Sequence, residues 1–193
     1  MLTKALLPAT FALLLAGCVS LSPKPPPSLL TLTSARTAPA GTTSTGDAAT
    51  ALAVVEPETE QRLGVVRVPV QTSDSTLAYL KDAIWVEKPA RLFQHLLSET
   101  IRAGGTRLVV AEGDFGYAAA TKLSGRLLDM GYDAASSSVV VRYDAVLQTP
   151  DGKVRTRRFE NRVSDVEPKV EAVGPALNEA ANAVAGDVAA WVG

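Results

Sequence analysis

Residues 139–163 read VVVRYDAVLQTPDGKVRTRRFENRV, and this stretch has the pattern of two strands joined by a tight turn. Apolar side chains recur at every second position of the first half, as expected for a strand with one face in a core. These residues are Val139, Val141, Tyr143, Ala145 and Leu147. Pro150-Asp151-Gly152 is typical of a hairpin turn, and Lys153 to Val163 would return as the second strand. The stretch therefore predicts a long antiparallel β-hairpin.

Two amphipathic patterns flank this hairpin. From Pro89 to Ile101 apolar residues recur at three- and four-residue steps, and Gly104-Gly105 follow as a helix stop. A second apolar stripe with the same spacing runs from about Pro175 to Val192. Short β-prone runs occupy much of the chain between residues 51 and 130. We therefore predict an α+β fold, with a largely antiparallel or mixed sheet and two helices packed on one of its faces.

The N-terminus has the three parts of a lipoprotein export signal. Lys4 supplies a positive charge, and the apolar run from Ala5 to Ala16 is too short to cross a bilayer. The run ends in Leu15-Ala16-Gly17-Cys18, which resembles the lipobox of bacterial lipoproteins. We expect residues 1–17 to be a signal peptide and Cys18 to be the acylated residue that holds the protein at a membrane. An ordinary export signal that ends in a cysteine is the alternative.

Residues 18–50 have the composition of a linker. Pro23, Pro25, Pro26 and Pro27 favour extended polyproline structure, and residues 33–50 are rich in Thr, Ala, Ser and Gly. We therefore expect a lipidated, flexible tether over residues 18–50 and one folded domain over residues 51–193. The run Leu29 to Leu32 leaves a second interpretation open, in which a short strand returns to the domain.

The residue types needed for catalysis are scarce. His95 is the only histidine and lies opposite the apolar stripe of its helix, and Cys18 is the only cysteine. The glycines form neither a phosphate-binding loop nor a dinucleotide fingerprint. A formal net charge of -1 argues against nucleic acid as a partner. We therefore expect no enzyme activity, no metal site, no cofactor and no nucleic-acid partner.

Arginines crowd the predicted hairpin: Arg155, Arg157 and Arg158 on the returning strand and Arg142 on its partner. They could contact an acidic partner or anionic lipid headgroups. The alternative is that they protect an edge strand from unwanted pairing. Two tryptophans lie near helices, and we expect Trp191 to join the core and Trp85 to plug one end of it.

Several short motifs together resemble the ABC-type transport auxiliary lipoproteins, the family that includes the lipoprotein of the paraquat-inducible Pqi system. The resemblance covers most of residues 51–193 plus the lipobox. The motifs are Val54-Val55-Glu56-Pro57-Glu58, Leu63-Gly64-Val65-Val66-Arg67-Val68, Leu77-Ala78-Tyr79, Trp85-Val86-Glu87-Lys88-Pro89 with Leu92, Val140 to Leu147, Arg157-Arg158-Phe159-Glu160 and Ala189-Ala190-Trp191-Val192.

The resemblance implies a role without catalytic residues. The chain would be a lipid-anchored periplasmic accessory that docks an MCE-domain protein, with the ABC permease and ATPase on separate chains. Such systems are thought to move phospholipids or other hydrophobic molecules between the inner and outer membranes. Val19, rather than an aspartate, follows Cys18, which resembles the sorting signal for the outer membrane. A homo-oligomer is a further possible assembly of the chain.

Two other functions are compatible with the same pattern. Small tethered envelope lipoproteins also activate or assemble peptidoglycan-synthesis or outer-membrane machinery. A domain with helices on a sheet could alternatively carry a lipid in a pocket between the two layers.

Overall fold

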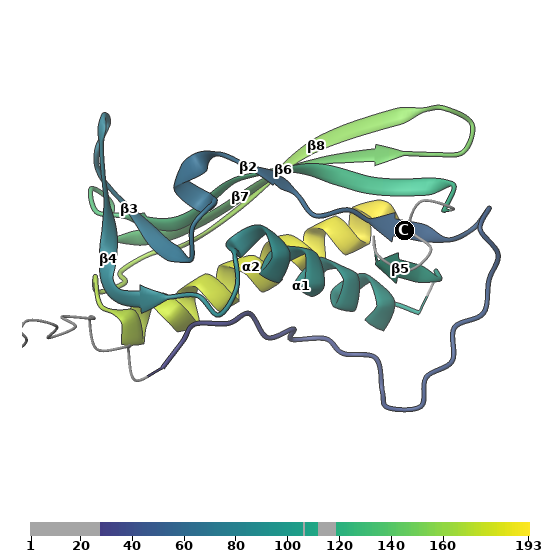
Figure 1. Ribbon diagram of the computed structural model, residues 1–193, viewed down its shortest axis with the longest axis horizontal. Coiled ribbons are helices and arrows are strands. Elements are labelled where there is room, and N and C mark those ends of the chain that lie inside the picture. Colours follow the sequence, from purple (N-terminus) through teal and green to yellow (C-terminus); the bar gives the residue numbers. More distant parts are fainter. Residues whose placement is uncertain (1–27, 106, 112–118) are drawn as a thin grey trace, which may run out of the picture.

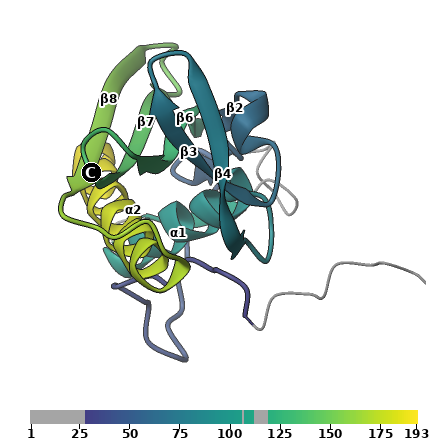
Figure 2. The same ribbon diagram turned by 90° about the vertical axis from the view of Figure 1, so that its left-hand side faces the viewer.

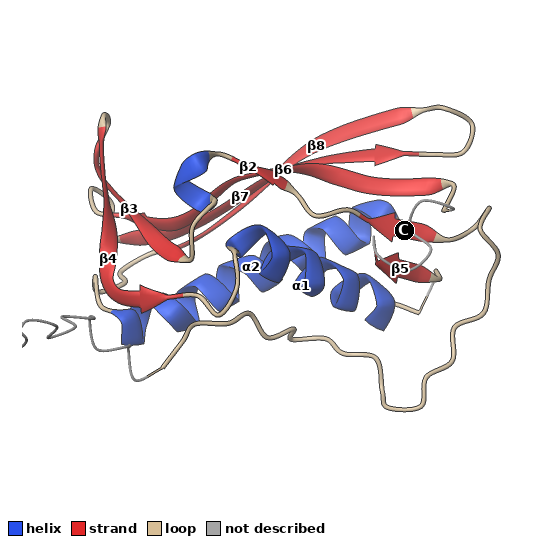
Figure 3. Cartoon of the chain, viewed as in Figure 1, coloured by secondary structure: helices blue, strands red, loops and turns tan. Residues whose placement is uncertain are grey.

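The computed structural model describes residues 28–193 except 106 and 112–118. It has three layers, a twisted eight-stranded sheet, two helices that cover one face of the sheet, and an extended N-terminal segment beyond the helices (Figures 1 and 3). The predicted α+β class is confirmed. The signal peptide, the lipobox residues Leu15, Ala16 and Gly17, and Cys18 lie outside the described residues.

The predicted hairpin is the longest regular part of the sheet. Its strands are β7 (Ser138–Gln148) and β8 (Val154–Val163), paired over ten positions without interruption. The remaining strands are β1 (Leu52–Val54), β2 (Glu58–Thr59), β3 (Arg67–Ser73), β4 (Thr76–Ile84), β5 (Val109–Ala111) and β6 (Thr121–Asp133). A short 3-10 helix, η1 (Gln61–Leu63), precedes β3.

The central strand β6 makes the sheet mixed. On one side it pairs antiparallel with β7. On its other side β1, β2 and β3 follow one another along its length, each parallel to it. The strands β4 and β8 lie at opposite edges, as Figure 2 shows.

The space between sheet and helices is filled with apolar side chains. The five alternating residues of β7 are at most 1% exposed, which confirms the face predicted from their spacing. Phe93 and Tyr143 make an edge-to-face contact with ring centroids 5.3 Å apart. The hydroxyl of Tyr143 donates to the carbonyl of Ser124 at 2.7 Å, so this buried polar group is satisfied. Trp85 is 1% exposed and plugs the core as predicted.

Helix α1 (Pro89–Ala103) has the predicted limits, with proline at its first position and Gly105 beyond its end at a positive φ of 70°. The sequence predicts that the last helix starts at about Pro175. Helix α2 (Val170–Val192) instead begins more than one turn earlier. The extra turn is held because Val173 is fully buried and Gly174 lies against Leu30. A Cβ atom at Gly174 would come within 2.7 Å of the Leu30 side chain.

Part of the expected tether is bound to the domain. Leu30 forms a parallel bridge with Trp85, and Leu30 and Leu32 pack against the core. Residues 30–38, here called the strap, then run along the two helices on the side away from the sheet (Figure 1). The prediction of a flexible tether over residues 18–50 is therefore wrong for the strap. The alternative, in which Leu29 to Leu32 return to the domain as a short strand, agrees better with the structure, although the pairing is limited to the single bridge of Leu30.

Side chains of the helices hold the main chain of the strap. Asn178 accepts from the amide of Thr33 at 2.8 Å. Asn182 accepts from the amide of Ala35 at 2.7 Å and donates to the carbonyl of Thr33 at 2.9 Å. Glu99 accepts from the amide of Ala38 at 2.9 Å. Because these bonds go to the backbone, the apolar pattern of the sequence does not reveal them.

Candidate partner-binding surface

Strand alternation separates the four arginines predicted to form one contact surface. In β8, Arg155 and Arg157 have the same parity as the buried Phe159 and lie on the helix-facing side, called the inner face. Arg158 pairs in register with Asp144, and Arg142 with Glu160, on the opposite, outer face of the sheet. The predicted basic cluster is therefore two pairs of arginines with different surroundings.

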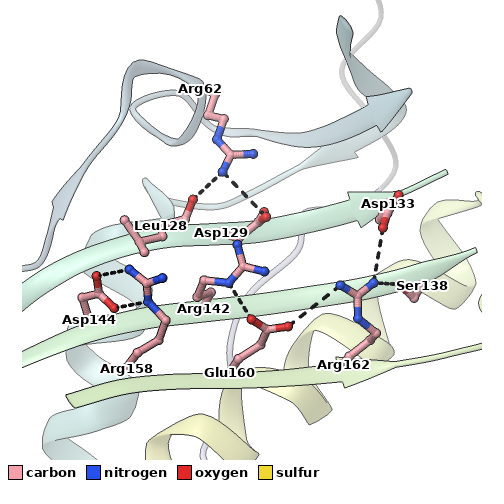
Figure 4. A network of polar contacts seen from close by, with 10 residues as sticks. All are labelled: Arg62, Leu128, Asp129, Asp133, Ser138, Arg142, Asp144, Arg158, Glu160 and Arg162. Carbon is pink, nitrogen blue, oxygen red and sulfur yellow. Dashed lines mark hydrogen bonds and ion pairs between the residues drawn. The ribbon is translucent and has the colours of Figure 1, made fainter. Parts of the chain in front are cut away.

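The outer-face arginines are neutralised by carboxylates (Figure 4). Arg158 donates to both carboxylate oxygens of Asp144, at 2.6 and 2.7 Å. Arg142 donates to Glu160 at 2.6 Å. These charge-assisted bonds lower the pKa of Asp144 and of Glu160 below their usual values. Arg142 and Arg158 therefore have their charge committed within the sheet.

A bulge in β6 shapes the middle of the outer face. The register of β6 on β7 shifts between Leu127 and Asp129, which leaves Leu128 as the extra residue. Arg62, from η1, donates to the carbonyl of Leu128 and lies 3.6 Å from the Asp129 carboxylate. Burial raises the pKa of Asp129, although Arg62 and Arg142 act in the opposite direction.

Beside this bulge the outer face is hollowed. A cavity of about 230 Å³ lies between β3 and the β6–β7 pair, and Arg62, Asp129, Arg142 and Arg162 contribute to its lining. Arg162 donates to Ser138 at 2.6 Å and to Asp133 at 3.3 Å. Since the charged groups around the cavity pair with one another, it presents a polar surface with little excess charge.

The inner-face arginines rest on aromatic rings instead. Arg155 lies over the ring of Trp191 with its guanidinium carbon 4.9 Å from the ring centre, and Arg157 lies over Phe159 at the same distance. Phe159 and Trp191 themselves meet edge to face at 5.7 Å. Among the residues that the structure describes, neither arginine has a carboxylate within ion-pair distance. Trp191 is half-buried at the edge of the core, where the sequence predicted a core residue.

The structure also places the single histidine and the acidic residues of the described ranges. His95 is exposed, as predicted. Within the described ranges no group of three His, Cys, Asp or Glu side chains is placed to hold a metal ion. None of the helices in the described part of the chain is long and apolar enough to span a bilayer.

Sequence reasoning missed Arg62, Asp129 and Asn182. The first two lie 67 residues apart in the chain, and the β6 bulge that joins them has no local signature. Asn182 is half-buried under the strap, and its partners there lie far away in the sequence. Because side chains alternate between the two faces of a strand, the sequence does predict that Arg155 and Arg157 lie on one face and Arg158 on the other.

Two solved structures have folds similar to that of this chain. Protein XCC0632 from Xanthomonas campestris, of the family DUF330, superposes with a TM-score of 0.72 at 16% identity, covering 86% of this chain and 94% of that protein. A second crystal structure, of an uncharacterized protein, has a TM-score of 0.64 at 14% identity and covers 75% and 92%. Both likenesses concern the fold. No curated protein matches the chain.

The fold and surface define a small α+β module with a filled interior, an ion-paired outer face and an open edge strand. The profile of the ABC-type transport auxiliary lipoprotein component matches residues 31–189. The chain therefore belongs to the ABC-type transport auxiliary lipoprotein family, as the sequence motifs indicated. The match begins at residue 31, inside the strap, so it includes this part of the expected tether.

Proposed function

We propose that this protein is a lipid-anchored, periplasmic accessory of an MCE-type ABC system that moves phospholipids or other hydrophobic molecules between the inner and outer membranes. It acts by docking a partner protein, the MCE-domain protein with its permease and ATPase, rather than by carrying the transported molecule. Membership of the auxiliary lipoprotein family and the lipobox at Cys18 support this role.

The filled interior is the observation that carries the docking role. Pockets for small molecules typically enclose roughly 300 to 1,000 Å³ and are lined by apolar side chains. Here the volume between sheet and helices is occupied by fully buried residues that include Phe93, Leu97, Tyr143 and Leu177. The 230 Å³ cavity lies on the outer face, outside this core, and its lining includes the charged residues Arg62, Asp129 and Arg142. A lipid would have to displace the core, so recognition must use the exterior.

The strap limits how far the domain can move from its anchor. If Cys18 is acylated, the chain from it to Leu30, where the chain joins the domain, is twelve residue-to-residue steps long. Fully extended, they reach about 40 Å. The domain then stays close to one membrane, by our proposal the outer membrane on its periplasmic side. The partner has to cover the remaining distance across the periplasm.

Gene deletion with complementation tests the proposal. We expect deletion to raise outer-membrane permeability to large antibiotics and to expose phospholipid on the cell surface, because lipid transport would slow. The unaltered gene should restore both. A soluble version, exported on a conventional signal peptide and present at equal abundance, should restore them incompletely, because docking at the membrane would be lost. Unchanged permeability and lipid asymmetry after deletion would contradict the transport role.

A further inference from the structure

The edge strand β8 is open along its length. It pairs with β7 and with no other strand in the described part of the chain. Residues 154–158 are all exposed, and Val154 is 58% exposed. Short length, bulges, prolines and charged side chains are the usual protections of an edge, and this ten-residue strand has its arginines but neither a proline nor a register shift. Its outward main-chain groups can therefore pair with an added strand of opposite charge.

The charge of β8 selects the kind of strand that fits. The strand contains four arginines and one glutamate. Arg158 and Arg162 are bound to carboxylates on the outer face, whereas Arg155 and Arg157 stand without one on the inner face. Residues two apart in a strand are separated by about 6.7 Å on one face. An added strand with acidic residues two apart would place its carboxylates opposite this pair.

The same charge disfavours a second copy of the chain. Pairing β8 with β8 would bring together two strands that each carry an excess of three positive charges. Lipid headgroups also fit the edge less well than a peptide does, because a lipid has no extended main chain to pair with β8.

We propose that the β8 edge binds an extended acidic segment of a partner protein by strand addition. Its main chain pairs with β8, and carboxylates two residues apart contact Arg155 and Arg157. The aromatic rings of Trp191 and Phe159 hold both guanidinium groups in place before binding, which reduces the side-chain entropy lost on docking. The inference rests on the proposed function in one respect, that the partner belongs to the transport system.

Photocrosslinking in cells tests the surface on the full lipidated chain. A photoreactive residue replaces Thr156, which is exposed on β8, and in a control strain it replaces Lys81 on the opposite edge strand β4. We expect an adduct from position 156 whose partner peptide, mapped by mass spectrometry, contains acidic residues two apart. An adduct with a second copy, an adduct with lipid, or no adduct would each overturn the proposal.

Matched glutamine variants test the role of the two arginines. The double variant Arg155→Gln with Arg157→Gln should lower the yield of the adduct by about tenfold, because both charge-assisted contacts are lost. Arg158→Gln, one residue away but on the outer face, should leave the yield unchanged. Equal thermal midpoints of the purified variants would establish that folding is intact. An unchanged yield in the double variant would overturn the proposal.

The identity of the partner separates the two proposals. An acidic segment that belongs to a protein outside any ABC transport system would support the β8 edge and contradict the proposed function. Conversely, a transport protein that crosslinks at Lys81 but not at Thr156 would support the proposed function and overturn the β8 edge.

Discussion

The two faces of the β6–β7–β8 sheet are built from the same strands but hold different chemistry. On the inner face β7 presents apolar residues that are at most 1% exposed, which pack against α2 and, through Tyr143, against Phe93 of α1. On the outer face several of the alternate residues form ion pairs, such as Arg142 with Glu160 and Arg158 with Asp144 (Figure 4). One residue along a strand separates a core position from a surface position.

This difference separates stability from recognition. Burial of apolar area supplies most of the free energy of folding, whereas exposed ion pairs contribute about 1 kcal/mol or less each. The outer face and the edge can therefore change during evolution with little effect on folding. Within β8 the contrast recurs, since Arg158 is paired with Asp144, while its neighbour Arg157 lies over the Phe159 ring and has no carboxylate within ion-pair distance in the described ranges.

The largest expected effect comes from breaking the inner face. Phe93 is fully buried against Tyr143, so Phe93→Ala should lower the free energy of unfolding by about 4 kcal/mol through lost burial and a new cavity. Denaturant unfolding of the purified domain measures it. Val86→Ala, at a half-exposed position, should change the value by less than about 0.5 kcal/mol. Similar losses in both variants would contradict the assignment of the core.

The strap tests whether the helices are covered on their second side. Asn182→Ala removes two hydrogen bonds to the strap, at Ala35 and Thr33, and should destabilise its docking by about 1 to 2 kcal/mol. Hydrogen exchange should then accelerate by about tenfold or more at the strap amides while the sheet remains protected. Glu179→Ala, at an exposed position on the same helix, is the control. Equal exchange in all three proteins would show that these bonds do not hold the strap.

A smaller effect is expected from two outer-face carboxylates, Asp129 and Asp144, which change the pH dependence of stability in opposite directions. Burial raises the pKa of Asp129, so the folded state binds its proton more tightly, and its contribution to stability grows as pH falls through that raised value. Arg158 lowers the pKa of Asp144, so its contribution is present at neutral pH and is lost as pH falls toward the lowered value.

Asn substitutions at these two positions therefore change the acid dependence in opposite directions. Relative to the unaltered protein, Asp129→Asn should lose stability more steeply between about pH 6 and pH 3, and Asp144→Asn less steeply. Denaturant midpoints at several pH values measure both slopes. Parallel slopes for the two variants would refute the contrast between Asp129, whose pKa burial raises, and Asp144, whose pKa Arg158 lowers.

The smallest expected effect is that of the exposed pair itself. Arg158→Gln should move the thermal midpoint by less than about 2 °C, because solvent screens this bidentate contact. Differential scanning calorimetry of the variant and the unaltered protein, at low and at high salt, measures this difference in thermal midpoint. A large, salt-dependent decrease would mean that the outer face carries stability after all.

Patterns with a fixed period were predictable from the sequence, and contacts between distant segments were not. The alternation from Val139 to Leu147 identified the inner face of β7, and the stripe after Pro89 identified α1 with its correct limits. The strap was missed because its bonds join backbone to Asn178 and Asn182, more than 140 residues away. The arginines were grouped by nearness in sequence, although their parity places them on opposite faces.

The central claim is that this lipoprotein works through its exterior, by holding another component of an ABC transport system. Affinity purification of the tagged, lipidated protein after crosslinking in cells tests this claim most directly, with partners identified by mass spectrometry. The account predicts recovery of an MCE-domain protein together with its permease. Recovery of peptidoglycan synthases or outer-membrane assembly proteins in their place would contradict it.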